Sequence, residues 1–562
     1  MPTMSKLPIW TPLASILLAL AWLLPNASPP WPAFHKDAWS AFVFCLVAAV
    51  VVFRRQTGGF RGFYLDPMVA VLLLLAVLPV VQWGLGVVHF SGHAAVGFGY
   101  FSAAALACLI GRTWEQSDPG KPGDFLFLAL LLAALGTSWL MLAQWLRLDV
   151  NDVWVNPLPS WGRPYGNLVQ PNNAATLLIL GMVSLFWFAV QGRIGKVVWG
   201  VGSAYLLFLV VLTGSRSGYL SLLVVTLLGL FMGWRRAEFR PWRGAFALLL
   251  GLFPLFVFLV TRDWGGETAF AQQPFERNLT SARLLVYRAY LEAAWASPWL
   301  GYGFEQGAVT QLASAALGHQ LPGLFTWAHN AFLDLATWFG IPVALLAMAA
   351  VAVSLVAVLR GPFDMKRAVY FAGTCVVFLH GMVELPLAYA YFLLPASLMA
   401  GAMLAGLKVF ALPLPRAGVA TVLVGLIAML GVITHDYLQI ESAFYTWRFK
   451  QANVGRNHPM DVPDTLLLNQ AEALLVGLRG TPESMTGDSL REFEQAVFLE
   501  PSAAALQHLA ELQLGRGDIA AAQRTADMGR LLTQGKERKA LAARWRYLGT
   551  QDPAFLAVVW RE

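Results

Sequence analysis

Charged residues are scarce in this 562-residue chain: Asp, Glu, Lys and Arg make up only 13% of it, whereas hydrophobic residues make up 57%. The mean hydropathy is +0.59. A chain of this length is too apolar for a soluble globular protein. The composition therefore predicts an integral membrane protein whose apolar segments cross the bilayer as helices.

Residues that bind metals or form disulfides are also few. The three cysteines lie in separate apolar runs without CxxC spacing, which predicts neither a disulfide nor a metal site. The expected external loops contain no DxD pair, no Walker sequence is present, and the spans carry no paired carboxylates at helical spacing. No metal or cofactor is expected, and arginines are the available phosphate ligands.

The net charge of +7 does not indicate a nucleic-acid partner. Much of the excess lies in short loops between apolar runs, as the positive-inside rule predicts for a membrane protein. The basic loops RRQTGGFR, WRRAEFRPWR and RGPFDMKR are therefore expected in the cytoplasm. The polar segments 147–173 and 262–328 are expected on the opposite side.

Apolar runs recur from Leu13 to about Ile433. Most are long enough to cross the bilayer, and together they predict about 12–13 transmembrane helices. Gly340 and Pro342 are expected to break or kink the helix that follows His329. Residues 1–435 are thus predicted to form a transmembrane domain, with 262–328 as its large periplasmic loop.

From about residue 436 charges become frequent and long apolar runs stop. Ala and Leu recur at helical spacing in SLREFEQAVFLEPSAAALQHLAELQLGRGDIAAAQRTADMGRLL, with Pro501 and Gly517 between the helical stretches. This pattern resembles tetratricopeptide helical hairpins. The predicted fold is an all-α polytopic membrane protein with a C-terminal periplasmic helical domain at 436–562.

Arginines on the expected external side are candidate phosphate ligands, because a guanidinium stays charged and grips phosphate oxygens with two N–H groups. Arg216 follows Gly214 and Ser215 at a helix start, where backbone N–H groups also attract anions. Each arginine could instead anchor its helix end among lipid head groups. An external position of Arg216 departs from the positive-inside rule. This favours a functional role for Arg216 over a role as a helix anchor.

His329 lies where a long arginine-containing polar loop meets an apolar run. It could be a general base near neutral pH, or a buried histidine that bonds a neighbouring backbone group. Glu384, in an outer turn, could orient that histidine, pair with an arginine, or be a lone interfacial carboxylate.

Five segments occur in an order that resembles the bacterial O-antigen ligase and polymerase superfamily. Within it they are most similar to the PglL-type protein O-oligosaccharyltransferases, as are PPWPAFHKDAW and the helical C-terminal extension. The segments are WGRPYGNLVQPNNAATLL, LTGSRSGY, SARLLVYRAYLEAAWASPWLGYGF, WAHNAFLDLATWFGIP and HGMVELPLAYAYFLL.

The resemblance implies a glycosyltransferase of the inner membrane with its active site on the periplasmic face. It would transfer a preassembled glycan en bloc from undecaprenyl diphosphate to Ser or Thr of periplasmic or pilin-like proteins, with inversion and without a metal. The bottom-up chemistry agrees, because arginines would stabilise the departing diphosphate.

The resemblance also implies roles for individual residues. His329 would act at the acceptor side, Arg216 and Arg283 would bind the diphosphate, and Glu384 would be the acidic residue of the HxxxE-P turn. These four form the expected catalytic set. The expected substrate-binding residues are Arg163, Asn167, Gln170, Asn173, Arg288, Asn330 and Tyr302.

Other functions remain open on the sequence alone. Ligation to a lipid A core sugar, or polymerisation of repeat units, would change only the acceptor. A transporter for a lipid-linked anion would carry ionisable residues near mid-span and broken helices in paired halves. The charges instead gather at one face without an internal repeat, and a pure scaffold would leave the five segments unexplained.

Overall fold

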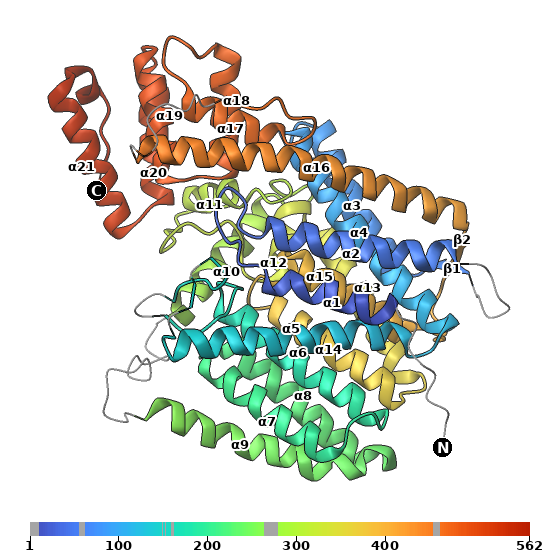
Figure 1. Ribbon diagram of the computed structural model, residues 1–562. Helices are drawn as coiled ribbons and strands as arrows, with labels where there is room; N and C mark the ends of the chain where they lie inside the picture. Colours follow the sequence, from blue (N-terminus) through green and yellow to red (C-terminus); the bar gives the residue numbers. More distant parts are fainter. Residues whose placement is uncertain are drawn as a thin grey trace. The chain divides into compact units, whose positions relative to one another are not determined.

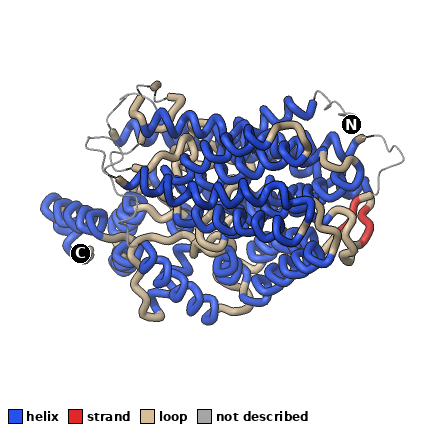
Figure 2. The backbone as a smooth tube through the Cα atoms, turned by 90° about the horizontal axis from the view of Figure 1, so that it is seen from below, coloured by secondary structure: helices blue, strands red, loops and turns tan. Residues whose placement is uncertain are grey.

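The structure is a computed structural model that describes residues 10–54, 62–148, 150–151, 153–158, 162–262, 279–452, 454 and 461–561. Most of the RRQTGGFR loop and residues 263–278 of the large loop lie outside the described residues. Figure 2 shows that nearly all regular structure in the described part is helical. The exception is a short antiparallel pair of strands, β1 (Phe63–Leu65) and β2 (Leu412–Leu414). The prediction of an all-α protein is confirmed.

Nine helical segments in the described part are long and apolar enough to cross a membrane, so the chain is a multi-pass membrane protein. They are α2 (Phe34–Phe53), α3 (Pro67–Gly84), α4 (Ser91–Ser117), α5 (Lys121–Trp145), α6 (Pro171–Val190), α8 (Arg216–Arg235), α9 (Arg243–Thr261) with the preceding 3-10 turn, α13 (Ile341–Arg360) and α16 (Arg416–Gln451).

Three further apolar helices are shorter: α1 (Trp10–Leu23), α7 (Lys196–Leu212) and α15 (Ala390–Leu404). The run before the HxxxE-P turn forms α14 (Met365–Gly381). The finer count of 12–13 spans stays a prediction.

The chain folds as two compact units. The first unit comprises Met1–Leu73, Phe101–Arg277 and Ala349–Leu430, and the second comprises Leu74–Tyr100, Asn278–Met348 and Gly431–Glu562. Each unit is built from segments far apart in the sequence, so its core depends on long-range packing.

In the first unit, successive helices from α5 to α9 pack against one another, as their neighbouring ribbons in Figure 1 show. Glycines allow the closest crossing, between α4 and α15. A Cβ atom on Gly401 would collide with the backbone of Cys108, and one on Gly111 would collide with the backbone of Leu398. Small residues of this kind let membrane helices approach closely.

In the second unit, the long loop contains α10 (Leu279–Ala296) and α11 (Gly307–Ala316), and α12 (Ala331–Phe339) follows it. Gly340 ends α12 with φ +92°, and α13 begins at the next residue. A Cβ atom at Gly340 would also collide with the backbone of Trp299. The predicted helix break is confirmed, and it has a steric cause.

The C-terminal helices are α17 (Asn469–Arg479), α18 (Gly487–Leu499), α19 (Ala503–Gly515), α20 (Ile519–Leu532) and α21 (Gly535–Gln551). Neighbours pack in pairs, α17 with α18 and α19 with α20, and Pro501 and Gly517 fall between helices as predicted. α16 continues to Gln451 without a break near residue 436. The tetratricopeptide resemblance and the domain boundary stay predictions.

A buried ion pair joins two membrane helices of the first unit. Arg112 in α4 donates to Asp66 Oδ2 at 2.6 Å, and Asp66 Oδ1 accepts the Val69 N–H at the start of α3. Both side chains are buried, at 6% and 0% exposure. Removing one partner of such a pair leaves the other charge buried and uncompensated.

We therefore expect Asp66→Leu to lower the free energy of unfolding by about 3–5 kcal/mol, seen as a lower unfolding temperature in detergent. The double variant Asp66→Leu/Arg112→Leu should recover most of that loss, leaving about 1 kcal/mol for the lost helix cap. Equal losses in the single and double variants would contradict the assignment.

Candidate active site

The expected site residues form two groups, one in each compact unit, and each group is described by itself. The group in the first unit contains Arg163, Asn167, Gln170, Asn173, Arg216 and Glu384. The group in the second unit contains Arg283, Arg288, Tyr302, His329 and Asn330.

Arg216 is the first residue of α8, as the sequence predicted, and it is exposed. The turn before it is tightly built. Ser215 Oγ caps the helix by accepting the Gly218 N–H at 3.0 Å, and Thr213 Oγ1 accepts the Ser215 N–H at 3.2 Å. A helix start carries a partial positive charge, so this turn combines a guanidinium with a site that attracts anions.

Arg163 joins this turn from the loop before α6. Its Nη1 donates to the Gly214 carbonyl at 2.8 Å, which brings a second guanidinium to the start of α8. The structure therefore brings together two of the arginines that the sequence singled out. Two clustered cations can bind a phosphate or diphosphate more strongly than either alone.

An amide that the sequence analysis missed holds the loop of Arg163 in place. Gln144 Oε1 accepts the N–H groups of Tyr165 and Gly166, and its Nε2 donates to the Asn156 and Gly166 carbonyls. The available signal was a lone glutamine near the end of an apolar run. Such a buried amide can satisfy the backbone groups of a loop without regular structure.

Asn167 also works within this loop. Its Nδ2 donates to the carbonyls of Leu23 and Trp154, its Oδ1 accepts the Asn156 N–H, and the residue is 1% exposed. Its side chain therefore positions the loop.

Two quoted segments meet at Glu384. Its Oε1 accepts Nδ2 of Asn172, at the start of α6, over 2.8 Å, and its side chain is buried. One turn earlier, His380 Nδ1 bonds Thr176 Oγ1 at 2.7 Å. The structure thus joins the HxxxE-P turn to the PNN segment. Gln170 and Asn173 flank the same helix start, and Asn173 is buried.

In the second unit, His329 has φ +58°, a left-handed conformation that is uncommon for residues other than glycine. Its carbonyl accepts the Tyr287 hydroxyl at 3.2 Å, and its ring makes an edge contact with Phe325. Asn330 caps α12 by accepting the Phe332 and Leu333 N–H groups. The histidine therefore stands directly before a well-capped helix.

Desolvation in its half-buried position, together with a smaller effect of the nearby charge of Arg283, lowers the pKa of His329 to about 4. The imidazole is therefore neutral at neutral pH and can accept a proton. Asp334, which the sequence analysis did not single out, lies in the first turn of α12. Asp334 Oδ1 accepts the Ala328 N–H at 2.6 Å, while burial raises the pKa of this carboxyl to about 7.

Arg283 and Arg288 differ in their surroundings although both lie on α10. The charge of Arg283 reaches His329 and Tyr287. Arg288 is 73% exposed and pairs with Glu292, which also contacts His319 Nε2 at 2.7 Å. Arg283 is therefore the arginine beside the histidine, in line with the weight that the sequence gave it.

Tyr302 connects two backbone segments through hydrogen bonds. Its hydroxyl donates to the Ala293 carbonyl at 3.0 Å, and its N–H donates to the Thr337 carbonyl at 2.7 Å. It thereby joins the segment after α10 to the end of α12.

The C-terminal helices hold the loop that leads to His329. Gln311 in α11 accepts the Phe325 N–H at 2.8 Å and donates to the carbonyls of Gly323 and Leu531. Gln534 donates to the Leu321 carbonyl. Ala308 and Leu312 of α11 also belong to the apolar core of the C-terminal helices. α11 therefore packs into the core of the C-terminal helices and holds the histidine loop through the hydrogen bonds of Gln311.

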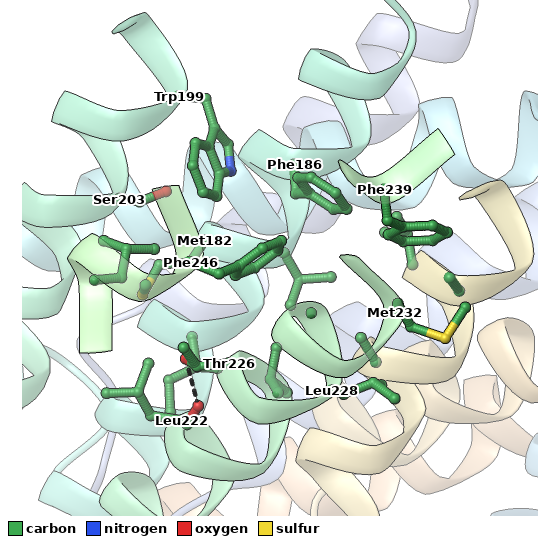
Figure 3. A pocket seen from close by; sticks show the side chains of 18 residues that line it. Met182, Phe186, Trp199, Ser203, Leu222, Thr226, Leu228, Met232, Phe239 and Phe246 are labelled. Atoms are coloured by element: carbon green, nitrogen blue, oxygen red, sulfur yellow. Dashed lines mark hydrogen bonds between the residues drawn. The ribbon is translucent and has the colours of Figure 1, made fainter. Parts of the chain in front are cut away.

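An apolar cavity lies in the first unit among α6, α7, α8, α9 and α14 (Figure 3). Aromatic rings line it, and Thr226 Oγ1 bonds the Leu222 carbonyl at 2.8 Å, drawn as a dashed line. Its volume is about 50 Å³. This is room for about one or two water-sized groups, so the cavity as it stands does not accommodate a lipid chain.

We expect Gln311→Leu to expose the histidine loop, because the Phe325 N–H and the Gly323 carbonyl would lose their partner at a cost of about 1–3 kcal/mol. Hydrogen exchange of the amides in 321–330 should accelerate roughly tenfold or more. Gln523→Leu is the matched control, since Gln523 in α20 bonds both backbone groups of Val559, which follows the last helical turn. Unchanged exchange in Gln311→Leu would contradict the support that Gln311 gives this loop.

Comparisons with known proteins show which families the chain is similar to. A family model described as O-antigen ligase matches residues 201–348, which contain Arg216, Arg283 and His329. A second, described as the C-terminal part of a virulence factor membrane-bound polymerase, matches residues 369–547, from α14 through the C-terminal helices.

Two curated proteins of Acinetobacter baylyi are similar to the chain. The general O-oligosaccharyltransferase is 27% identical over 529 residues, which cover 91% of this chain and 90% of that protein. The ComP-specific O-oligosaccharyltransferase is 28% identical over 243 residues, which cover 43% of this chain and 44% of that protein.

Proposed function

Since the chain belongs to the O-antigen ligase superfamily and is a glycosyltransferase like its relatives, we propose that it is a protein O-oligosaccharyltransferase. In this proposal it transfers a preassembled glycan en bloc from undecaprenyl diphosphate to Ser or Thr hydroxyls, with inversion and without a metal. The observation that carries the proposal is a half-buried histidine, neutral at neutral pH, at a capped helix start, with Arg283 beside it.

Arg216 and Arg163 are proposed to bind the diphosphate of the donor. When the bond from the anomeric carbon to the diphosphate oxygen breaks, negative charge develops on that oxygen. Two guanidinium groups at a helix start stabilise this charge more in the transition state than in the ground state, which lowers the barrier. Arg283 supplies a further positive charge on the histidine side.

His329 is proposed to accept the proton of the acceptor hydroxyl. The hydroxyl oxygen forms a bond to the anomeric carbon on the face opposite the departing diphosphate, so the configuration inverts. The proton moves to the imidazole, which burial keeps neutral and ready. Tyr287 and Asn330 hold the backbone at the histidine, and the Phe325 ring contacts the imidazole.

A protein acceptor is favoured over a lipid A core sugar or a growing glycan chain. The general O-oligosaccharyltransferase is similar to this chain over about nine-tenths of both proteins. In the second unit these helices support the histidine loop, and we propose that they contribute to the approach of a pilin-like or other periplasmic protein. The proposed location is the inner membrane, with the chemistry on the periplasmic side.

Transfer to a pilin-like acceptor by the purified full-length enzyme, with an undecaprenyl-diphosphate donor and EDTA, tests the proposal. We expect product from the wild type. His329→Ala should lower the rate by a factor on the order of 10²–10⁴, because the general base is lost. Arg216→Ala should lower it by a factor on the order of 10²–10³, because the leaving group loses a positive charge.

Arg235→Gln is the control. Arg235 is exposed at the other end of α8, and its substitution removes one positive charge, as Arg216→Ala does. Its rate should equal that of the wild type. Product on lipid A core, or lengthened lipid-linked chains without glycosylated protein, would move the assignment to ligase or polymerase. Loss of wild-type product in EDTA, restored by a divalent metal, would refute metal independence.

The pH dependence gives a separate test. A base with a pKa of about 4 stays unprotonated from neutral pH down to near that value, so the acidic fall in rate should lie near pH 4, below the ordinary histidine pKa of about 6.5. Arg283→Gln removes a positive neighbour and should move this fall to higher pH. A fall near 6.5 in the wild type would contradict the burial of the base.

A further inference from the structure

A second, larger pocket lies in the first unit, where α13 ends and the chain leaves α15. Its volume is about 490 Å³, within the range of roughly 300–1,000 Å³ that is usual for ligand sites. It is lined by one stripe of α13, by the turn that follows α13, and by the segment 406–410 after α15. None of the residues assigned to glycan transfer lines it.

The residues of α13 that line the pocket are apolar except the last, which is an arginine. Val353, Val356, Ala357 and Arg360 line the pocket at the i, i+3, i+4 and i+7 spacing of one helix face. Val353 and Val356 are exposed side chains of a membrane-spanning segment. A hydrocarbon chain can therefore lie along this stripe, with Arg360 at its end.

The opposite wall carries a second cation. Lys408 and Phe410 lie on the segment between α15 and β2, and Phe410 is 75% exposed. The pairing of β2 with β1 ties the far end of this segment. No acidic residue lines the pocket, and within the described part of the chain neither Arg360 nor Lys408 has an ion-pair partner.

Arg367 has a different role from Arg360 and Lys408: it holds the segments that form the pocket. Its guanidinium donates to the carbonyls of Met403 at 3.0 Å and Ala405 at 2.7 Å, and also to the Pro362 carbonyl. These bonds clamp the turn after α13 to the end of α15. Gly361 permits the close approach, because a Cβ atom there would collide with Leu407. The hydrogen bonds of Arg367 and the small size of Gly361 therefore fix the shape of the pocket.

We propose that this pocket binds an anionic glycerophospholipid of the membrane. Its phosphate lies between Arg360 and Lys408, and an acyl chain runs along Val353 and Val356. Charge complementarity selects the anionic lipid, since basic pockets between membrane helices attract anionic head groups. The exposed Phe410 ring suits the interfacial level beside the head group. The sequence predicts that RGPFDMKR, which forms part of the pocket, faces the cytoplasm.

The test is native mass spectrometry of the full-length protein in detergent, titrated with phosphatidylglycerol and, separately, with phosphatidylcholine. We expect the wild type to retain phosphatidylglycerol in preference. Arg360→Gln/Lys408→Gln should weaken its binding roughly tenfold or more, because both phosphate contacts are lost. Arg235→Gln/Arg240→Gln removes the same charge from another exposed basic loop and should leave binding unchanged.

Ala357→Phe keeps both cations and fills the apolar wall, so it should also reduce phosphatidylglycerol binding. Thermal unfolding in lipid-free detergent checks that each variant is folded. Equal binding of the two lipids by the wild type would overturn the proposal. So would unchanged phosphatidylglycerol binding in both pocket variants, or an equal loss in the Arg235/Arg240 control.

Discussion

The partial burial of the His329 imidazole is the condition on which the proposed chemistry depends. A histidine in water would be partly protonated near neutral pH, whereas desolvation and Arg283 keep this one neutral. The apolar side chains around this site come from α10, α12 and the loop before α12. That loop has little regular structure, so Gln311, Tyr290 and Gln534 of the C-terminal part satisfy its backbone groups. The C-terminal helices are therefore part of the support of the site.

The arginine group in the first unit is organised in the same way. Arg216 owes its position to a helix start that Ser215 caps, and Arg163 owes its position to a loop that Gln144 holds. In both units a side-chain amide satisfies the backbone of an irregular loop, and the loop then presents a charged or basic residue. Fixed positions of this kind spare the site from reorganising as charge develops in the reaction.

The two ends of α13 have different surroundings. α13 begins at the Gly340 break that follows the histidine helix, and it ends at Arg360 in the basic pocket. The unpaired cations there have no part in the proposed transfer. Exposed apolar residues of α13 and of segment 406–410 lie beside these cations, which is the combination that the proposed lipid site requires.

The sequence by itself determined the features that depend on local physics. Hydropathy located the helices, Gly214–Ser215 marked the start of α8 at Arg216, and Gly340 marked a break. Asn167, Asn330 and Tyr302 were expected to bind substrate, but their described hydrogen bonds go to backbone groups. Gln144, Asp334 and Gln311 escaped notice altogether. Only the tertiary structure decided these roles, because the burial of a polar side chain and its partners depend on segments that are often distant in sequence.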